Sequence, residues 1–505
     1  MTISYDQIPD STPILIGGGQ IVAREAGDAS PMALAGQATI NALNDAGVEG
    51  LAEQIDTICV TRLFSDMGHL WPCKWGRSDN PPQSIAQIIG ATPAHRIYTQ
   101  TGGNEPQSRL IEFAHDIARG ERSVVLLTGA EALRNQRHAE RNENELDWSE
   151  KFTQELDDRE MGISVATSQE LKNGLLNVMY YYALIEQAQR HDSGRSITEH
   201  QQAMATLLES FSEVASANPY AQFPGKQSAA DILAAPALSH LYTKRMIAQD
   251  GVNQGAAVLM CSVAKAREMG VPESKWVFLH GMAEGLELEL TRRPDPGRSA
   301  MAGLVAHKAM SIAGLNIDDI DLIDIYSCFP CAVTAVAEHL DLPADGSRPL
   351  TLTGGLPYFG GPGNNYSMHA LVEAIWRSRS EADSYVMVTA NGGMLSKHAA
   401  GVYSGVPSTT DWANTETTIN RERLESREVC KDPGTGTVIS YTAQYDREGN
   451  PHAIILGETD GGQRFVAITA DDDSATASAI FDEDPTGKRV FVAAPMDERL
   501  NFQLA

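Results

Sequence analysis

The hydrophobic pattern of the chain alternates between short apolar runs and segments with helical spacing. Ser30 can cap a helix that starts at Pro31 and stops before Gly47. Five continuous runs, rich in valine, isoleucine and leucine, have the polar borders that buried strands have. They are Thr57–Val60, Ser123–Thr128, Val277–His280, Leu322–Ile325 and Tyr385–Thr389. This alternation predicts an α/β protein in which helical layers surround parallel strands.

Two regions depart from this pattern. Residues 131–160 are crowded with charges and predict a solvated insertion that leaves the sheet, and helical patterns continue from about 162 to 217. Residues 411–432 are polar and predict a linker, after which four strand-like segments at 436–445, 452–457, 464–469 and 489–493 predict a small all-β module. We therefore expect an N-terminal half over 1–285 with an insertion at about 131–245, a C-terminal half over 286–410, and a linker with an additional domain over 411–505.

An internal repeat relates the two halves. When Asn104 is aligned with Asn365, residues 101–131 match residues 362–393 without a gap, and Val125 meets Val386. Both copies have a glycine-rich loop, a helix, a polar turn and a strand. The match predicts a duplicated fold.

The loops of this repeat suggest a chemistry. Glycine lets a ligand approach the backbone, and a helix start offers free N–H groups and a positive dipole end. These features suit a phosphate or a thioester carbonyl that becomes negative. Neither copy is a P-loop or a complete dinucleotide fingerprint. We expect the two helix starts to face one cavity.

Composition and charge argue against several classes of protein. The chain has 505 residues and a formal charge of −27, which argues against a general nucleic-acid binder. Its first 20 residues lack a signal-peptide pattern, and no apolar run is long enough for a membrane span. We expect a cytoplasmic protein. Cys328 and Cys331 form a lone Cys-x-x-Cys pair, so we expect no metal site, while a redox pair and a packed thiol stay open.

Several motifs, in order, resemble the thiolase superfamily, especially the thiolases related to sterol carrier protein. The resemblance covers about residues 10–405 and includes Asn218–Phe223, Gln254–Ala257, Asp321–Phe329, Gly354-Gly355 and Asn391–Met394. The tail resembles the extra C-terminal domain of thiolase-like proteins of type 1 and small OB-fold domains. The resemblance implies a duplicated, layered αβαβα fold with a helical loop insertion and a C-terminal OB-like domain. It also implies acyl-CoA, or coenzyme A itself, as substrate or ligand.

The chain departs from the family pattern at each standard catalytic position. Gly103 stands near the position of the nucleophilic cysteine, Gly361 lies in the loop that usually carries Gly-His-Pro, Thr389 falls near the second cysteine, and Tyr326 replaces a histidine. We therefore expect carbon–carbon bond chemistry on acyl-CoA thioesters without an acyl-cysteine. The candidate residues fall into three groups. They are Tyr326, Cys328 and His369 for catalysis; Gly102, Gly103, Asn104, Gly361, Asn391, Gly392 and Gly393 for the oxyanion and thioester; and Lys226, Lys244 and Arg245 for the phosphates of CoA.

Three functions remain open from the sequence. The first is an acyltransferase of the acetyl-CoA acetyltransferase type. The second is an acyl-CoA-binding protein without catalysis, and the third is a retro-aldolase that cleaves 3-hydroxyacyl-CoA by proton transfer alone. Because family members usually pair through the central sheet, we expect a homodimer, unless the insertion or tail blocks it, or a partner bound through the OB-like domain.

Overall fold

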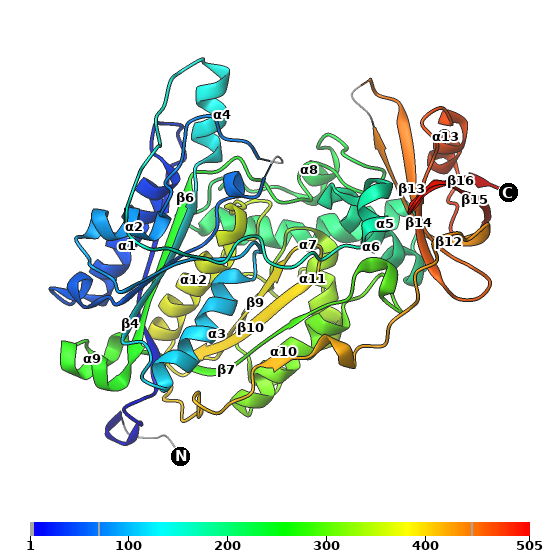
Figure 1. Ribbon diagram of the computed structural model, residues 1–505. Coiled ribbons are helices and arrows are strands. Elements are labelled where there is room, and N and C mark those ends of the chain that lie inside the picture. The colour runs from blue at the N-terminus through cyan, green and yellow to red at the C-terminus, as the bar shows by residue number, and fades with distance from the viewer. Residues whose placement is uncertain (1–4, 69–70, 446–447) are drawn as a thin grey trace.

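The protein consists of a layered α/β body and a small β-barrel at one end (Figure 1). The computed structural model describes residues 5–68, 71–445 and 448–505. In these ranges the body contains one mixed sheet of eleven strands, and the barrel closes from five. The expected α/β fold with a small C-terminal β domain is confirmed. No helix within the described ranges is long and apolar enough to cross a bilayer.

The sheet is mixed rather than parallel as expected. β2 pairs in parallel with β3 and β4, and β8 with β9, whereas β1, β6, β7 and β10 pair antiparallel with one another or with β4 and β9. β9 and β10 are joined by a tight turn, and such a short connection permits only antiparallel pairing. In sheet order the strands are β5 (Asp157–Asp158), β3 (His95–Tyr98), β2 (Thr57–Val60), β4 (Val124–Glu131), β6 (Gln254–Ser262), β1 (Pro13–Val22), β7 (Val277–Leu286), β10 (Lys397–Ser404), β9 (Val386–Gly392) and β8 (Leu322–Asp324), and β11 (Thr418–Ile419) pairs with β7.

The two halves have the same topology. In the first half the order is β2-β4-β6-β1, and in the second it is β8-β9-β10-β7, with one parallel pair followed by two antiparallel pairs in each. β1 and β7 join the halves through Ile14 and Leu15. The strands β4 and β9 therefore correspond, as the alignment of Val125 with Val386 predicted.

Helices form the layers around this sheet. α3 (Glu105–Ala118) and α12 (Tyr366–Ser380) contact each other and strands of both halves, and they share one apolar cluster with them. α1 (Pro31–Ala46) and α2 (Pro81–Ile89) cover the outer face of the first half, and α10 (Ala300–Ala313) and α11 (Pro330–Ala337) that of the second. α1 has the predicted bounds, with Ser30 accepting the N–H of Ala33 and Gly47 in the left-handed conformation. The central helices bring both glycine-rich loops to the middle of the molecule.

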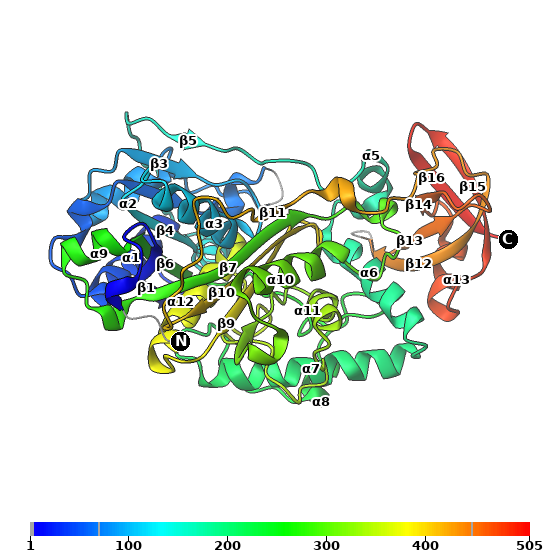
Figure 2. The same cartoon turned by 90° about the horizontal axis from the view of Figure 1, so that it is seen from below.

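The insertion does not leave the sheet entirely. After α4 (Leu133–Arg141), the segment returns along the sheet edge, where β5 pairs with β3 through Asp157 and Asp158 (Figure 2). Buried Arg62 forms an ion pair with Asp158 and lies 4.3 Å from the centre of the Tyr98 ring. The edge of β3 is thus covered by the chain's own insertion. The helices α5 (Ser168–Glu170), α6 (Val178–Asp192), α7 (Ile197–Ala217) and α8 (Ala229–Leu233) follow it, and α9 (Val263–Met269) comes after β6.

The C-terminal barrel docks firmly on the insertion. Its strands are β12 (Thr435–Tyr445), β13 (Pro451–Glu458), β14 (Arg464–Ile468), β15 (Arg489–Met496) and β16 (Arg499–Leu504), with helix α13 (Ser474–Asp482) between β14 and β15. Ser440 donates to the backbone oxygen of Leu184 on α6 at 2.6 Å, and Arg190 pairs with Asp484. The ring of His240 stacks on Tyr441 at 4.8 Å. These contacts place the barrel in one body with the helical insertion.

The segment at 411–432 is more than a linker. Trp412 is fully buried, and β11 adds to the central sheet beside β7. The polar side chains of this segment gave no sign of a strand, because strands pair through backbone N–H and C=O groups and not through side chains. The segment therefore both connects the barrel to the body and packs against the body.

We predict that Asn173→Ala loosens the barrel. Buried Asn173 accepts the N–H of Leu500 at 2.9 Å and donates to the oxygens of Glu498 and Gln169, each at 2.7 Å. Unsatisfied backbone groups should cost about 1–3 kcal/mol. Urea unfolding and hydrogen exchange of the Leu500 amide measure the loss. The exposed substitution Gln202→Ala is the control, and equal effects of both would contradict this role.

Candidate functional site

The two glycine-rich helix starts meet at the centre of the molecule. The N–H of Gly102 donates to Oδ1 of Asn364 at 3.1 Å, and the hydroxyl of Ser367 donates to the oxygen of Gly103 at 2.7 Å. Asn365 also donates from Nδ2 to the oxygen of Gly129 at 2.7 Å. Side chains from one half thus bond directly to the loop of the other.

The tyrosine that replaces the family histidine occupies the space of the missing nucleophile. A methyl group added at Gly103 would lie 2.6 Å from Cζ of Tyr326, and closer still to its hydroxyl. It would also lie 2.6 Å from the oxygen of Asn391. Contacts this short exclude any side chain at residue 103 while Tyr326 keeps its position. The absent cysteine and the new tyrosine are therefore sterically linked.

The glycine loops approach each other backbone to backbone. A methyl group on Gly392 would lie 2.9 Å from Cα of Gly102 and 3.0 Å from the nitrogen of Gly103. Oδ1 of Asn104 fills the position where either Gly102 or Gly392 would carry a side chain, and Gly102 has a φ of 151°. These positions tolerate only glycine.

The space beside Tyr326 is small. A cavity of about 10 Å³ lies between Tyr326, Asn391, Leu395 and the α10 and α11 helices, which is room for about one water. The open cavity expected between the helix starts is instead filled by Asn364, Ser367 and Tyr326. A pantetheine arm needs more room than this conformation provides.

Cys328 and Asn391 lie together at the edge of this junction. Nδ2 of Asn391 is 3.7 Å from the sulfur of Cys328 and donates to the hydroxyl of Tyr182 at 2.8 Å. Cys328 is half-buried, and burial raises the pKa of its thiol to about 11. At neutral pH the group is a thiol rather than a thiolate, so it is a poor nucleophile.

Two polar groups at the junction lack partners. The Tyr326 hydroxyl has no hydrogen-bond partner among the described residues, although the side chain is only 7% exposed. Oδ1 of Asn391 is buried and also unpartnered within those residues. Burial raises the pKa of Tyr326, which keeps the hydroxyl protonated and able to donate. The buried oxygen of Asn391 and the Tyr326 hydroxyl, which is not fully enclosed, suit a ligand that supplies the missing hydrogen bonds.

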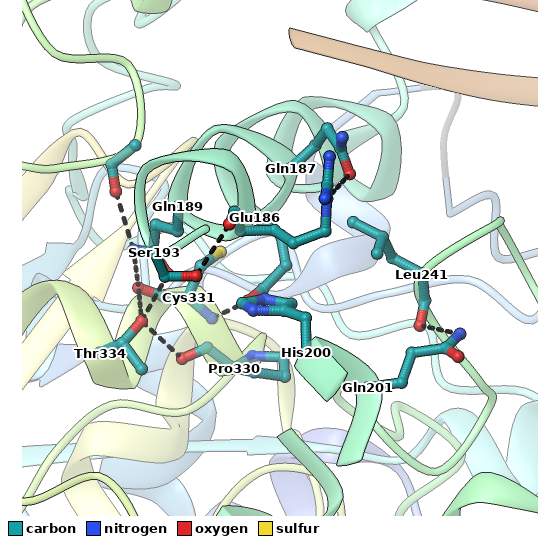
Figure 3. A network of polar contacts seen from close by, with 12 residues as sticks. Glu186, Gln187, Gln189, Ser193, His200, Gln201, Leu241, Pro330, Cys331 and Thr334 are labelled. Atoms are coloured by element: carbon teal, nitrogen blue, oxygen red, sulfur yellow. Dashed lines mark hydrogen bonds and ion pairs between the residues drawn. The ribbon is translucent and has the colours of Figure 1, made fainter. Parts of the chain in front are cut away.

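Helix α6 bonds to two loops at the junction, one around Asn391 and one around Cys331. The hydroxyl of Tyr182 accepts hydrogen bonds from Asn391 and from the N–H of Leu395, at 2.8 and 2.9 Å. One turn later, Glu186 accepts the N–H of Cys331 at 2.8 Å, at the start of α11, and also bonds to His200 at 2.7 Å (Figure 3). Sequence reasoning missed Tyr182 and Glu186, because a helix in an insertion carries no motif that marks its inward face.

The other predicted residues lie elsewhere. His369 is fully buried, its Nδ1 is 2.6 Å from Oε1 of Gln20, and the rings of Phe359 and Tyr366 stand between it and Tyr326. Burial lowers its pKa to about 3, so its ring is neutral at pH 7. The structure does not bring His369 to the junction.

The remaining candidates divide between packing and surface. Gly361 packs against the 248–249 segment and donates to the oxygen of Gln249 at 2.8 Å, whereas Gly393 is exposed beside Val165. Lys226 is exposed and paired with Glu213 at 2.8 Å. Lys244 and Arg245 are exposed on the segment in which the N–H of Ala248 donates to the oxygen of Cys328 at 2.9 Å. A cluster of three or more residues that could bind a metal ion was not found within the described residues.

We predict that Gly103→Ala destabilises the protein through its clash with Tyr326. Overpacking of this kind costs about 1–3 kcal/mol. The shorter ring in Tyr326→His should recover part of this loss when the two changes are combined, and urea unfolding of the four proteins in a double-mutant cycle measures the coupling. Additive losses would contradict the proposed steric link.

We also predict that Cys328 alkylates slowly near neutral pH. Because its pKa is raised, the thiolate fraction should still grow about tenfold per pH unit at pH 9, where a free cysteine with a pKa of about 8.5 levels off. Peptide mass spectrometry after timed iodoacetamide treatment gives the rate, and N-acetylcysteine in the same buffers is the control. A plateau below pH 8 would show an activated thiolate instead.

The chain matches known proteins along its whole length. Residues 422–498 match the family described as the thiolase-like protein type 1 additional C-terminal domain. An acetyl-CoA acetyltransferase of Methanothermobacter thermautotrophicus is 24% identical over 398 residues, which cover 75% of this chain and 94% of that protein. The structure of the Ltp2-ChsH2(DUF35) aldolase is similar in fold, with a TM-score of 0.58, 17% identity, and coverage of 78% of this chain and 98% of that one.

One solved structure covers the body and the barrel together. The crystal structure of a monomeric SCP2-thiolase like protein type 1 from Mycobacterium smegmatis has a TM-score of 0.83 and is 34% identical, and the match covers 99% of this chain and 100% of that chain. The same arrangement of duplicated halves, helical insertion and additional barrel is thus found in both chains. The chain belongs to the thiolase-like proteins of type 1.

Proposed function

We propose that the protein binds a CoA thioester at the junction of its two halves and acts on a carbon–carbon bond without an acyl-cysteine. The observation that carries this proposal is the Tyr326 hydroxyl, which takes the place of the nucleophile and has no partner among the described residues. The similarity to an acetyl-CoA acetyltransferase supports a CoA thioester as the ligand. Glycine at residue 103 leaves no group there that could form an acyl-enzyme.

The junction suits an enolate intermediate. When a bond beside a thioester breaks or forms, negative charge develops on the thioester oxygen, and preorganised donors stabilise it. Tyr326 supplies one such donor, and the starts of α3 and α12 supply the positive ends of helix dipoles. Cys328, protonated at neutral pH, can deliver a proton as a general acid. In retro-aldol cleavage of a 3-hydroxyacyl-CoA the 3-hydroxyl loses its proton to water as the carbon–carbon bond breaks, and Cys328 returns a proton to the enolate carbon. No acyl-enzyme is needed, so we favour this reaction over thiolysis.

Substrate entry requires a covering segment to move. Val165 packs against Gly393, and two apolar residues of the same segment, Met161 and Ile163, are 44% and 50% exposed. Large apolar side chains held at the surface cost little to displace. Moving Val165 would expose Gly393, two residues from Asn391 at the junction. Lys244 and Arg245, near the Cys328 loop, are then placed to meet the phosphates of CoA.

A second function is favoured by the closed junction itself. A protein that has filled its catalytic cavity can bind acyl-CoA, or only present a surface, without catalysis. The cavity of about 10 Å³ is the observation that supports this alternative. Binding without turnover distinguishes it from the first proposal.

We propose that a single chain carries the activity. A second copy cannot pair with β3 to form the expected homodimer, because β5 already occupies that edge of the sheet. The relative from Mycobacterium smegmatis is described as monomeric. The barrel, which we take to be OB-like, then serves as a brace or a partner interface rather than a nucleic-acid site, in keeping with its acidic sequence. A cytoplasmic location stays a prediction.

We predict that Tyr326→Phe abolishes turnover but preserves binding. The change removes one oxygen, so the fold should persist, while loss of one oxyanion donor should lower kcat about 100- to 1,000-fold. Purified protein is incubated with acetoacetyl-CoA and a series of 3-hydroxyacyl-CoAs, products are identified by mass spectrometry, and calorimetry measures CoA affinity.

Tyr385→Phe, at the residue before β9, is the matched control and should leave activity unchanged. A kcat in Tyr326→Phe equal to that of the natural protein would remove the assigned role. Tight binding without turnover in the natural protein would support the non-catalytic alternative, and no binding of any CoA compound would remove both.

A further inference from the structure

A second pocket lies on the other side of the Gly102–Asn104 loop from Tyr326. It is about 220 Å³, far larger than the cavity beside Tyr326, and it is open to solvent. The first two turns of α3 form one wall and the adjoining ends of β7 and β10 form the other. Its polar lining includes Asn104, Glu105, Ser108, Arg109, Glu284 and Lys397. Asn104 and Ile163 of this lining belong to segments that the acyl-CoA proposal uses, whereas Lys397 and Glu284 have no part in it.

Lys397 is the unusual residue of this pocket. It is 6% exposed, and its Nζ donates to the backbone oxygen of Thr101 at 2.5 Å. Within the described residues no carboxylate lies within 4.0 Å of Nζ. A lysine is almost never buried unless it is paired, because an ammonium ion loses its hydration there. A buried lysine without a counterion that faces a pocket is a reactive-site candidate.

The charged neighbours of Lys397 are few. Glu105 is held by Arg109 at 3.3 Å on α3. Glu284 lies on β7, where the pairing of Lys397 with Leu286 and of Ala399 with Glu284 puts Lys397 and Glu284 diagonally on one face of the sheet. Diagonal neighbours are about 7–8 Å apart, within reach of long side chains. The two carboxyl groups stand against two cations of the same lining, Arg109 and Lys397, so the charges balance and an uncharged ligand fits this pocket.

Burial shifts the pKa values of Lys397 and Glu284 in the directions that the reaction of an amine with a carbonyl compound requires. It lowers the pKa of the Lys397 ammonium, so more of the group is free amine at neutral pH. Burial also raises the pKa of Glu284, which favours its protonated form. A free amine is a nucleophile, and a nearby carboxylic acid is a proton donor.

We propose that Lys397 forms an imine with a small aldehyde or ketone bound in this pocket. The Nζ lone pair attacks the carbonyl carbon, and after one amine proton moves to the oxygen a carbinolamine results. Glu284 protonates the departing hydroxyl, water leaves, and the nitrogen becomes doubly bonded to the former carbonyl carbon. Loss of the remaining N–H proton to the Glu284 carboxylate gives the neutral imine, so one water is released and no oxidant is needed. The proposal is independent of acyl-CoA binding at Tyr326.

Reductive trapping tests this proposal on the full-length protein. Propionaldehyde and cyanoborohydride are added at pH 7, and peptide mass spectrometry follows propylation of each lysine with time. We expect Lys397 to be modified faster than the exposed Lys226 and Lys244, because its lowered pKa leaves a larger fraction of its amine unprotonated at pH 7. Modification of Lys397 no faster than these internal controls would overturn the proposal.

Two variants separate the parts of the mechanism. Glu284→Gln should slow the modification of Lys397 about a hundredfold, the usual contribution of an acid–base group, and leave Lys226 unchanged. An equal rate in this variant would remove Glu284 from the step. Tyr326→Phe should trap aldehyde at Lys397 as the natural protein does, so failure of the acyl-CoA proposal and failure of this one are distinguishable.

Discussion

The close approach of two glycine loops is the constraint on which the centre of this protein depends. Gly102 and Gly103 touch Gly392 across the halves, and Tyr326 closes the remaining space. Tyr326 and Gly103 thus form one steric unit, in which neither residue can change alone at no cost. A side chain at residue 103 and a tyrosine ring at residue 326 therefore exclude each other in this geometry. Contact between the halves is tight because no side chain separates the loops.

Helix α6 connects this centre to the barrel. Its inward face presents Tyr182 and Glu186 to the Asn391 and Cys331 loops, while the backbone of Leu184 and the side chain of Arg190 bond to the barrel. A helix that is fastened on both sides has little freedom to rotate. The barrel therefore supports the geometry of the junction through one rigid element, without touching the junction itself.

Local features of the chain could be predicted from sequence, and contacts between distant segments could not. The cap at Ser30, the strand Thr57–Val60 and the repeat that aligns Val125 with Val386 depend on neighbouring residues or on duplication, and each corresponds to an observed element. The burial of Trp412 and the pairing of Asp157 depend on partners hundreds or tens of residues away. The same limit applies to the site: motif position found Tyr326, Cys328 and Asn391, whereas it gave no sign of Tyr182 or that rings isolate His369.

The covered edge of β3 has a consequence for how the protein behaves in a cell. An assembly that completes its sheet with a second copy responds to dilution, since its folded population follows mass action. Here residues 157 and 158 supply the missing strand from within the same chain, at an effective concentration fixed by covalent connection. The pairing of this strand is therefore independent of how many copies of the protein the cell makes.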